Sequence, residues 1–292
     1  MPTLNLAEMR KSHPDISDDW TIPQNWEHFT KDDHEVWRTL YQRQLEVLPG
    51  RACDEFMDGL EKLPLGADHI PRFDELNAAL SRLTGWTVVA VPSLVPDAEF
   101  FAHLANRRFP AGNFIRRRES LDYIEEPDVF HDVFGHVPML ALPVFADYME
   151  AYGKGGLRAL SEFGALENLA RLYWYTVEFG LIETPKGLRI YGSGIVSSRT
   201  ESIYCLQSPS PNRIHFDLER VMRTKYRIDD FQESYFVISG FQELFGETYK
   251  DFAALYRKLA TGATHLPGDV LATDRVHHRG DRSYKPHSHQ AA

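Results

Sequence analysis

Stripes of apolar side chains at helical spacing constrain the fold of this chain more than any other feature of its sequence. Within residues 36–45, 73–83 and 166–177, apolar residues recur three or four positions apart, which places them on one face of a helix. Thr30 and Asp33 have the spacing of a capping box at the start of the first stripe. These three segments therefore predict helices that each turn one face to a core.

Other segments predict a fourth helix and a small amount of β-structure. The β-branched run at residues 87–91 predicts a strand, and residues 188–191 and 202–206 predict two more strands around a glycine-rich turn. Together, the predicted helices and strands indicate a fold that is mainly α with minor β. The late helix is indicated by Tyr249, Phe252, Tyr256 and Leu259.

No repeat or low-complexity linker divides the middle of the chain, so residues 21–262 are expected to form a single domain. Residues 1–20 and 263–292 are polar or lack periodicity, which predicts a flexible N-terminal segment and a poorly ordered C-terminal tail. The tail histidines are interpreted as solvated residues rather than metal ligands, because no regular element would fix their geometry. They are His277, His278, His287 and His289.

The composition limits the kind of partner. Of the 292 residues, 43% are hydrophobic, which is enough for a sizeable core. A net charge of −10 disfavours nucleic acid and anionic membranes, so a small molecule is the expected ligand. Cys53 and Cys205 match no disulfide or zinc pattern. Since no signal peptide or membrane span is visible either, we expect a cytoplasmic protein.

Residues 125–138 hold the densest cluster of side chains that could perform chemistry. His131 and His136 are five positions apart, which on an ideal α-helix is about 140° around the axis. For the two imidazoles to share a metal, the helix is expected to end between them. Gly135 and Pro138 would supply that ending, because glycine accommodates a terminating conformation and proline cannot continue the hydrogen-bond ladder.

Glu178 is the best candidate for a third ligand, because it lies in the apolar stretch 172–181, where a carboxylate is costly unless it is paired or bound to a cation. Two histidines and one carboxylate leave open positions on an octahedral ion, as in oxygen-activating ferrous enzymes. Structural zinc fits less well, since neither cysteine is near these residues.

Three other readings of these residues remain open. The histidines could be satisfied core residues, and Glu178 a paired or snorkelling side chain. His131-Asp132 is also compatible with an HD-type metal phosphohydrolase, although only Arg116-Arg-Arg offers a basic phosphate pocket and no further His and Asp ligands are obvious. A scaffold protein that binds metal without catalysis is a third possibility.

Three longer motifs occur in order along the chain: EPDVFHDVFGHVP at residues 126–138, YWYTVEFGL at 173–181 and YGSGIVSS at 191–198. With these motifs the chain resembles the pterin-dependent aromatic amino acid hydroxylases over about residues 20–260. The resemblance implies the catalytic fold of that family within residues 21–262. Compared with the animal enzymes, we expect the regulatory domain and the long tetramerisation helix to be absent, and we also expect a monomer.

The resemblance implies roles for individual residues around iron and substrate. His131, His136 and Glu178 match the iron ligands. Arg116 matches the arginine that grips the substrate carboxylate, and Asp128 matches the acid that orients it. The remaining matches are Trp174, which walls the substrate ring, and Gly194 and Ser197 in the substrate-side turn, where Ser197 could also hold an imidazole ligand.

Further matches concern the pterin. Phe100 matches the aromatic residue that stacks on the bicyclic ring, and Leu94 and Val95 match a loop whose backbone binds the pyrimidine edge. Tyr173 is expected to line the same cavity. Asp132 stands where many relatives carry Glu, so a water-bridged contact is expected in place of a direct one. Ile124 replaces a threonine of the animal enzymes, so a polar contact near the substrate amino group is expected to be missing.

The activity that the resemblance implies is hydroxylation of an aromatic amino acid by dioxygen, with Fe(II) and tetrahydrobiopterin or a related tetrahydropterin. Trp174 and Val237 favour L-phenylalanine, converted to L-tyrosine, over tyrosine or tryptophan as substrate. Tryptophan is the alternative substrate within the family. A pterin-recycling enzyme is the implied functional partner.

Overall fold

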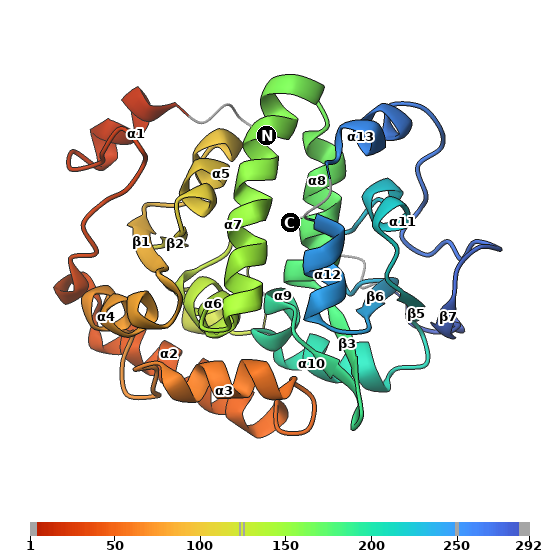
Figure 1. Ribbon diagram of the computed structural model, residues 1–292. Helices are drawn as coiled ribbons and strands as arrows, with labels where there is room; N and C mark the ends of the chain where they lie inside the picture. Colours follow the sequence, from red (N-terminus) through yellow and green to blue (C-terminus); the bar gives the residue numbers. More distant parts are fainter. Residues whose placement is uncertain (1–4, 123, 125, 249–250, 286–292) are drawn as a thin grey trace. The chain divides into compact units, whose positions relative to one another are not determined.

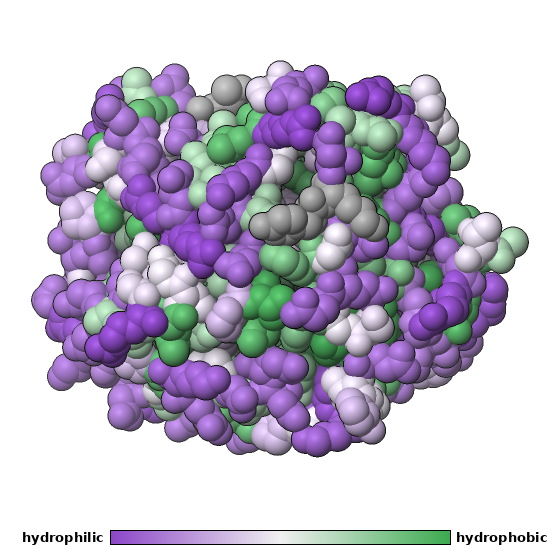
Figure 2. Space-filling view, in the orientation of Figure 1, coloured by the Kyte–Doolittle hydropathy of each residue, from purple (hydrophilic) through white to green (hydrophobic). Residues whose placement is uncertain are grey.

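The computed structural model describes residues 5–122, 124, 126–248 and 251–285. Its contacts divide the chain into two compact units. The first comprises Met1–Glu46 and Asp54–Gly164, and the second Val47–Cys53 and Ala165–Ala292. Each unit is described by itself. Polar side chains cover most of the surface in view in Figure 2, with apolar side chains between them.

The first unit is built mainly from helices, with one pair of parallel strands (Figure 1). Aromatic side chains fill its core, and among them Trp37 packs edge-on against Phe130 at 5.3 Å between ring centroids. The elements are α1 (Leu6–Ser12), the 3-10 helix η1 (Trp26–His28), α2 (Lys31–Val47), α3 (Asp54–Lys62), α4 (Phe73–Thr84), β1 (Thr87–Val91), α5 (Asp97–Ala105), β2 (Arg108–Gly112), the 3-10 helix η2 (Arg118–Ser120), the π-helix η3 (Phe130–His136), α6 (Val137–Leu140), α7 (Pro143–Arg158) and the π-helix η4 (Ala159–Phe163).

The local signals in this unit are confirmed. The Thr30 hydroxyl accepts from the Asp33 amide at 3.2 Å, and the Asp33 carboxylate accepts from the Thr30 amide at 2.7 Å, as a capping box requires. Gly85 ends α4 with a φ of 77°, a conformation that favours glycine. The predicted strand at 87–91 is β1, which pairs in parallel with β2.

Two glycines of α7 let α5 approach closely, and Figure 1 shows the two helices side by side. A Cβ atom at Gly153 would lie 2.3 Å from the backbone nitrogen of Ala105, and one at Gly156 would lie 2.0 Å from the ring of Phe101. Real Cβ atoms do not approach other atoms so closely. The position of α5, which carries Phe100, therefore depends on the absence of side chains at these two positions.

The second unit combines helices with a five-stranded mixed sheet of order β4-β3-β6-β5-β7. The central strand β6 is buried along its whole length and runs parallel to β3 and β5, whereas β4 and β7 are antiparallel to their neighbours. The elements are α8 (Leu166–Tyr173), the π-helix η5 (Trp174–Glu178), β3 (Leu181–Thr184), β4 (Gly187–Ile190), α9 (Ser193–Val196), α10 (Arg199–Gln207), β5 (Asn212–His215), α11 (Leu218–Arg223), β6 (Ser234–Ile238), α12 (Phe241–Thr248), α13 (Ala253–Leu259) and β7 (Val276–His278).

One secondary-structure prediction in this unit is wrong. Residues 202–206 lie inside the helix α10, which begins after Ser198, whose hydroxyl caps the Glu201 amide at 3.3 Å. A short apolar run does not distinguish a strand from a buried helix, and the cap signal decides the outcome here. The strand predicted at 188–191 corresponds to β4, and α13 occupies most of the predicted late helix. Tyr249, its first predicted residue, lies outside the described residues.

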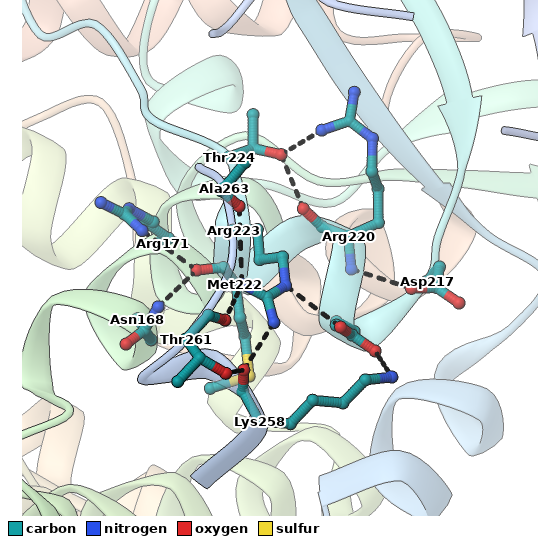
Figure 3. A network of polar contacts seen from close by, with 11 residues as sticks. Asn168, Arg171, Asp217, Arg220, Met222, Arg223, Thr224, Lys258, Thr261 and Ala263 are labelled. Atoms are coloured by element: carbon teal, nitrogen blue, oxygen red, sulfur yellow. Dashed lines mark hydrogen bonds and ion pairs between the residues drawn. The ribbon is translucent and has the colours of Figure 1, made fainter. Parts of the chain in front are cut away.

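Polar contacts connect α11 to α8, to the end of α13 and to the residues that follow α13 (Figure 3). The carbonyl of Met222 accepts from Asn168 and Arg171 on α8. Arg223 donates to the carbonyls of Lys258, Thr261 and Ala263. The two bonds to the Met222 carbonyl hold α8, which continues directly into η5.

The ends of the chain contain two elements that the sequence patterns did not indicate. Residues of the predicted N-terminal segment form α1, in which no residue is buried. In the predicted tail, β7 pairs with β5 and contains His277 and His278, whereas His287 and His289 lie outside the described residues. Among the described helices, none is both long and apolar enough to span a bilayer. The predicted fold class, mainly α with minor β, is confirmed.

Candidate metal and substrate site

His131 and His136 face each other from the π-helix η3. Their Nε2 atoms are 3.3 Å apart and their rings are nearly perpendicular, at 83°. Two nitrogens on adjacent positions of one octahedral ion, each about 2.1 Å from the metal, are about 3 Å apart. The pair is therefore spaced as two ligands of one ion would be.

The predicted way of bringing the two histidines together is wrong. The helix does not end between them but continues through Gly135 into α6, with Pro138 in its first turn. A π-helix bonds each residue to the fifth one along, so side chains five positions apart come to lie on the same side. The backbone hydrogen-bond pattern, and not a chain break, thus aligns the two imidazoles.

A buried aromatic ring and a buried acid help to hold the histidine pair. Phe109 on β2 packs against the His136 ring with a centroid distance of 4.7 Å. Asp132, between the two histidines, is 8% exposed, and its Oδ2 accepts from the Gly112 amide at 2.8 Å. This bond ties the end of β2 to η3 and so helps to fix the helix that carries the imidazoles.

Arg116 and Asp128 form a buried, bidentate ion pair. Arg116 Nε and Nη2 donate to the two oxygens of Asp128, both at 2.8 Å, and Nη1 donates to no described residue. Burial acts to raise the pKa of the Asp128 carboxyl, but the hydrogen bonds and charge of Arg116 outweigh it and the pKa is lowered. The backbone amides of Arg116 and His131 also donate to this carboxylate, at 2.9 and 3.0 Å.

In the second unit, Trp174 and Glu178 are the first and last residues of the π-helix η5. The Ser193 hydroxyl donates to Glu178 Oε2 at 2.9 Å and to the Val177 carbonyl at 3.0 Å. Ser193 was not among the predicted site residues, although it lies within the motif at 191–198. Its hydroxyl holds the Glu178 carboxylate in one orientation.

The turn that follows β4 packs directly against Glu178. A Cβ atom at Gly192 would lie 2.4 Å from the Glu178 carbonyl oxygen, and one at Gly194 would lie 3.1 Å from the same atom. Ser197 closes the short helix α9 by donating to the Ser193 carbonyl at 2.7 Å. Glycine at 192 is thus required by close approach of the backbone, and the predicted substrate-side turn is a support for Glu178.

The predicted pterin residues are divided between the two units. Leu94 and Val95 lie in the loop before α5 and Phe100 lies on α5, all in the first unit. The Leu94 amide donates to the Glu126 carboxylate at 3.3 Å, and Phe100 meets Phe101 edge-on at 5.8 Å. Tyr173 ends α8 in the second unit.

Paired imidazoles, a buried guanidinium–carboxylate pair and a carboxylate held by a serine are all groups that metal-dependent enzymes use. The family model of biopterin-dependent aromatic amino acid hydroxylases matches residues 7–261. The chain belongs to this family. Its membership confirms the resemblance seen in the three motifs and removes the basis for an HD-type phosphohydrolase.

Similar curated proteins are phenylalanine-4-hydroxylases. That of Caulobacter vibrioides is 64% identical over 271 residues, which cover 93% of this chain and 92% of the relative. That of Chromobacterium violaceum is 60% identical over 266 residues, covering 91% and 89%. A solved structure of the Chromobacterium violaceum enzyme with iron and phenylalanine bound has a TM-score of 0.87 at 55% identity, covering 94% of this chain and all of that one.

Proposed function

We propose that this protein converts L-phenylalanine to L-tyrosine with dioxygen and a tetrahydropterin at a ferrous iron centre. The observation that carries the proposal is the near full-length identity of 60–64% to three bacterial phenylalanine-4-hydroxylases. The structure of one such relative binds both iron and phenylalanine. Tryptophan is the competing substrate within the family.

We propose His131, His136 and Glu178 as the iron ligands. Each offers one ligand atom, an imidazole nitrogen or a carboxylate oxygen, and this set leaves positions open on the metal. The 3.3 Å separation of the two Nε2 atoms and the serine that orients Glu178 support the assignment. Bound iron, together with the reduced pterin, would supply the activation of dioxygen; the protein holds the ligands and excludes water.

We propose that Arg116 binds the substrate carboxylate. Asp128 holds the guanidinium through Nε and Nη2, so the Nη1 edge remains available to an anionic group. An arginine fixed in this way loses little side-chain entropy when it binds a carboxylate. Trp174 would wall the substrate ring, with Gly194 and Ser197 forming the neighbouring turn.

We propose that the pterin stacks on Phe100 and is bound by the backbone of Leu94 and Val95. Asp132 has a shorter side chain than the Glu of many relatives and its Oδ2 accepts from the Gly112 amide, so we expect it to reach the pterin through a bridging water. Tyr173 would line the same cavity. The half-exposed side chain of Leu94, 46% accessible, supports a loop that is open to a ligand.

We propose a cytoplasmic location, with a pterin-recycling enzyme as functional partner. The two cysteines, Cys53 and Cys205, are both buried and form no disulfide. A reducing compartment suits such thiols. The expected monomeric state can be checked by the mass of the protein in solution.

The test is a reconstitution assay. Protein stripped with a chelator is expected to make no tyrosine, and ferrous iron with a tetrahydropterin and oxygen is expected to restore tyrosine formation from phenylalanine. Tyrosine and hydroxytryptophan are quantified by chromatography, with an anaerobic sample as control. Absence of tyrosine from protein that holds one iron per chain would refute the proposal. Faster hydroxylation of tryptophan than of phenylalanine would show that tryptophan is the preferred substrate.

A further inference from the structure

The indole of Trp174 is held by three neighbours within the second unit. It stacks on Tyr226 with a centroid distance of 4.4 Å and an angle of 16°, and Phe179 lies 4.9 Å away. Its Nε1 donates to Gln232 Oε1 at 2.9 Å. Stacking sets the plane of a ring but lets it slide, whereas a directed hydrogen bond selects one position within that plane.

Gln232 is itself fixed in one orientation. It is 1% exposed, and its Nε2 donates to the carbonyls of Arg227 at 2.9 Å and Asp230 at 3.4 Å. If the amide were flipped, an oxygen would face these two carbonyls and an NH₂ group would face the indole N–H. Because both contacts would be lost, Oε1 must point to Trp174.

The main chain of Gln232 is anchored by a buried acid. Its amide donates to Glu201 Oε1 at 3.4 Å, and the same oxygen accepts from the hydroxyl of Tyr235 on the central strand β6. Glu201 lies on α10 and is 6% exposed. A continuous set of hydrogen bonds thus runs from β6 through Glu201 and Gln232 to the indole on η5.

We propose that Gln232 is a positioning residue that sets the indole of Trp174 against the substrate ring. The inference rests on the ring-wall role of Trp174 in the proposed function. A misplaced indole lets the aromatic ring of the substrate shift away from the reacting position. Loss of Gln232 Oε1 is then expected to weaken phenylalanine binding and to lower the fraction of oxidised pterin that yields tyrosine, while iron binding stays unchanged.

The first variant is Gln232→Met, which keeps an unbranched side chain of similar length and removes both the acceptor for the Trp174 indole and the Nε2 donor to the Arg227 and Asp230 carbonyls. The KM for phenylalanine is expected to rise about fivefold to tenfold, the effect of one lost buried hydrogen bond. Tyrosine formed per pterin oxidised is expected to fall, and iron content to match the wild type. Trp174→Phe removes the donor and also replaces the indole by a smaller ring, so its KM is expected to rise at least as much.

The double variant separates positioning from general destabilisation. If Gln232 acts through the indole N–H, adding Gln232→Met to Trp174→Phe changes the KM by less than about twofold. Gln44→Met is the matched control, because Gln44 is 2% exposed but lies on α2 in the first unit. Its effects are expected to multiply with those of Trp174→Phe, and it is expected to leave the product yield per pterin unchanged.

Each outcome has one meaning. Multiplicative effects of Gln232→Met and Trp174→Phe, or an unchanged KM and product yield in both single variants, would overturn the positioning role. Thermal unfolding of each variant checks that it is folded; if Gln232→Met does not fold, an unchanged KM and yield in Trp174→Phe alone overturns the role. If the wild type itself makes no tyrosine, the proposed function fails. That result differs from each of the results that would overturn the positioning role of Gln232.

Discussion

Two buried carboxyl groups of this chain differ in charge because their partners differ. Asp128 is held by a guanidinium and by two backbone amides, and its pKa is lowered. Burial raises the pKa of Glu201 to about 7, because its hydrogen bonds from the Tyr235 hydroxyl and the Gln232 amide bring no positive charge. The folded protein therefore keeps Asp128 ionised and binds a proton at Glu201 far more readily than the unfolded chain does.

This difference predicts how stability depends on pH. Since the folded pKa of Glu201 lies above its unfolded value, its contribution is complete at low pH and is lost as the pH rises through about 7. Glu201→Gln has no titrating group at this position and so does not share this loss. From pH 5.5 to pH 7.5, the wild type is expected to lose about 2 kcal/mol in the free energy of unfolding relative to this variant. Urea unfolding at both pH values measures it, and equal differences at the two would contradict the assignment.

Residues proposed to bind a ligand were easier to predict than the residues that support them. The two histidines and Glu178 stood out because metal-binding side chains lay among apolar ones, whereas Arg116 and Asp128 were identified from the family resemblance. Ser193 and Gln232 are neutral and occur in unremarkable surroundings, and their partners are 15 and 58 positions away along the chain. Only the fold reveals such contacts, since no local pattern encodes them.

Close approach of helices depends on particular glycines, and α7 offers a controlled test of this. Gly153→Ala would place a methyl group against the backbone of Ala105 and Leu104, which cannot move away as a flexible side chain can. A loss of about 1–3 kcal/mol in the free energy of unfolding is expected from such overpacking. Gly155→Ala on the same helix meets nothing within 4 Å and is expected to be neutral or stabilising by up to about 1 kcal/mol.

Thermal and urea unfolding of the two alanine variants measure this contrast. Because α5 carries Phe100, Gly153→Ala is also expected to raise the KM for the pterin, whereas Gly155→Ala is not. Equal stability of the two variants would show that α5 does not depend on this contact.

Helices with strong apolar stripes and caps were predicted well, because their signals are local. The strand predicted at 202–206 was wrong because a five-residue apolar run fits a helix equally well, and the cap at Ser198 carried the decisive signal. The π-helices η3 and η5 were not predicted at all. Their spacing departs from the helical period only over a few residues, which a search for stripes does not resolve.

The last part of the described chain is held by polar contacts between distant residues. Arg220 on α11 pairs with Asp274 at 3.0 Å, and their side chains are 5% and 3% exposed. Arg220 also donates to the Asp269 carbonyl at 2.6 Å. Since such contacts have no periodicity, the segment looked like a loose tail in the sequence, although β7 begins at Val276, two residues after Asp274.

Removing one partner of this buried pair is expected to destabilise the protein strongly. Asp274→Ala leaves Arg220 without its counter-charge and should lower the free energy of unfolding by about 3–5 kcal/mol. Asp229→Ala is the control, because Asp229 pairs with Arg227 at 3.1 Å but its side chain is 65% exposed; a change within about 1 kcal/mol is expected. Urea midpoints compare the two, and similar losses would argue against a structural role for the buried pair.

In the π-helix η3, the backbone hydrogen bonds align side chains that are five positions apart. The number of residues between His131 and His136 therefore decides whether their imidazoles face each other. Substitutions at the intervening positions change side chains but leave the five-residue repeat intact. Deleting or inserting one residue there would rotate one nitrogen donor away from the other, even though every ligand is still encoded. The π-helix η3 should therefore tolerate conservative substitutions between the two histidines far better than the insertion or deletion of a residue there.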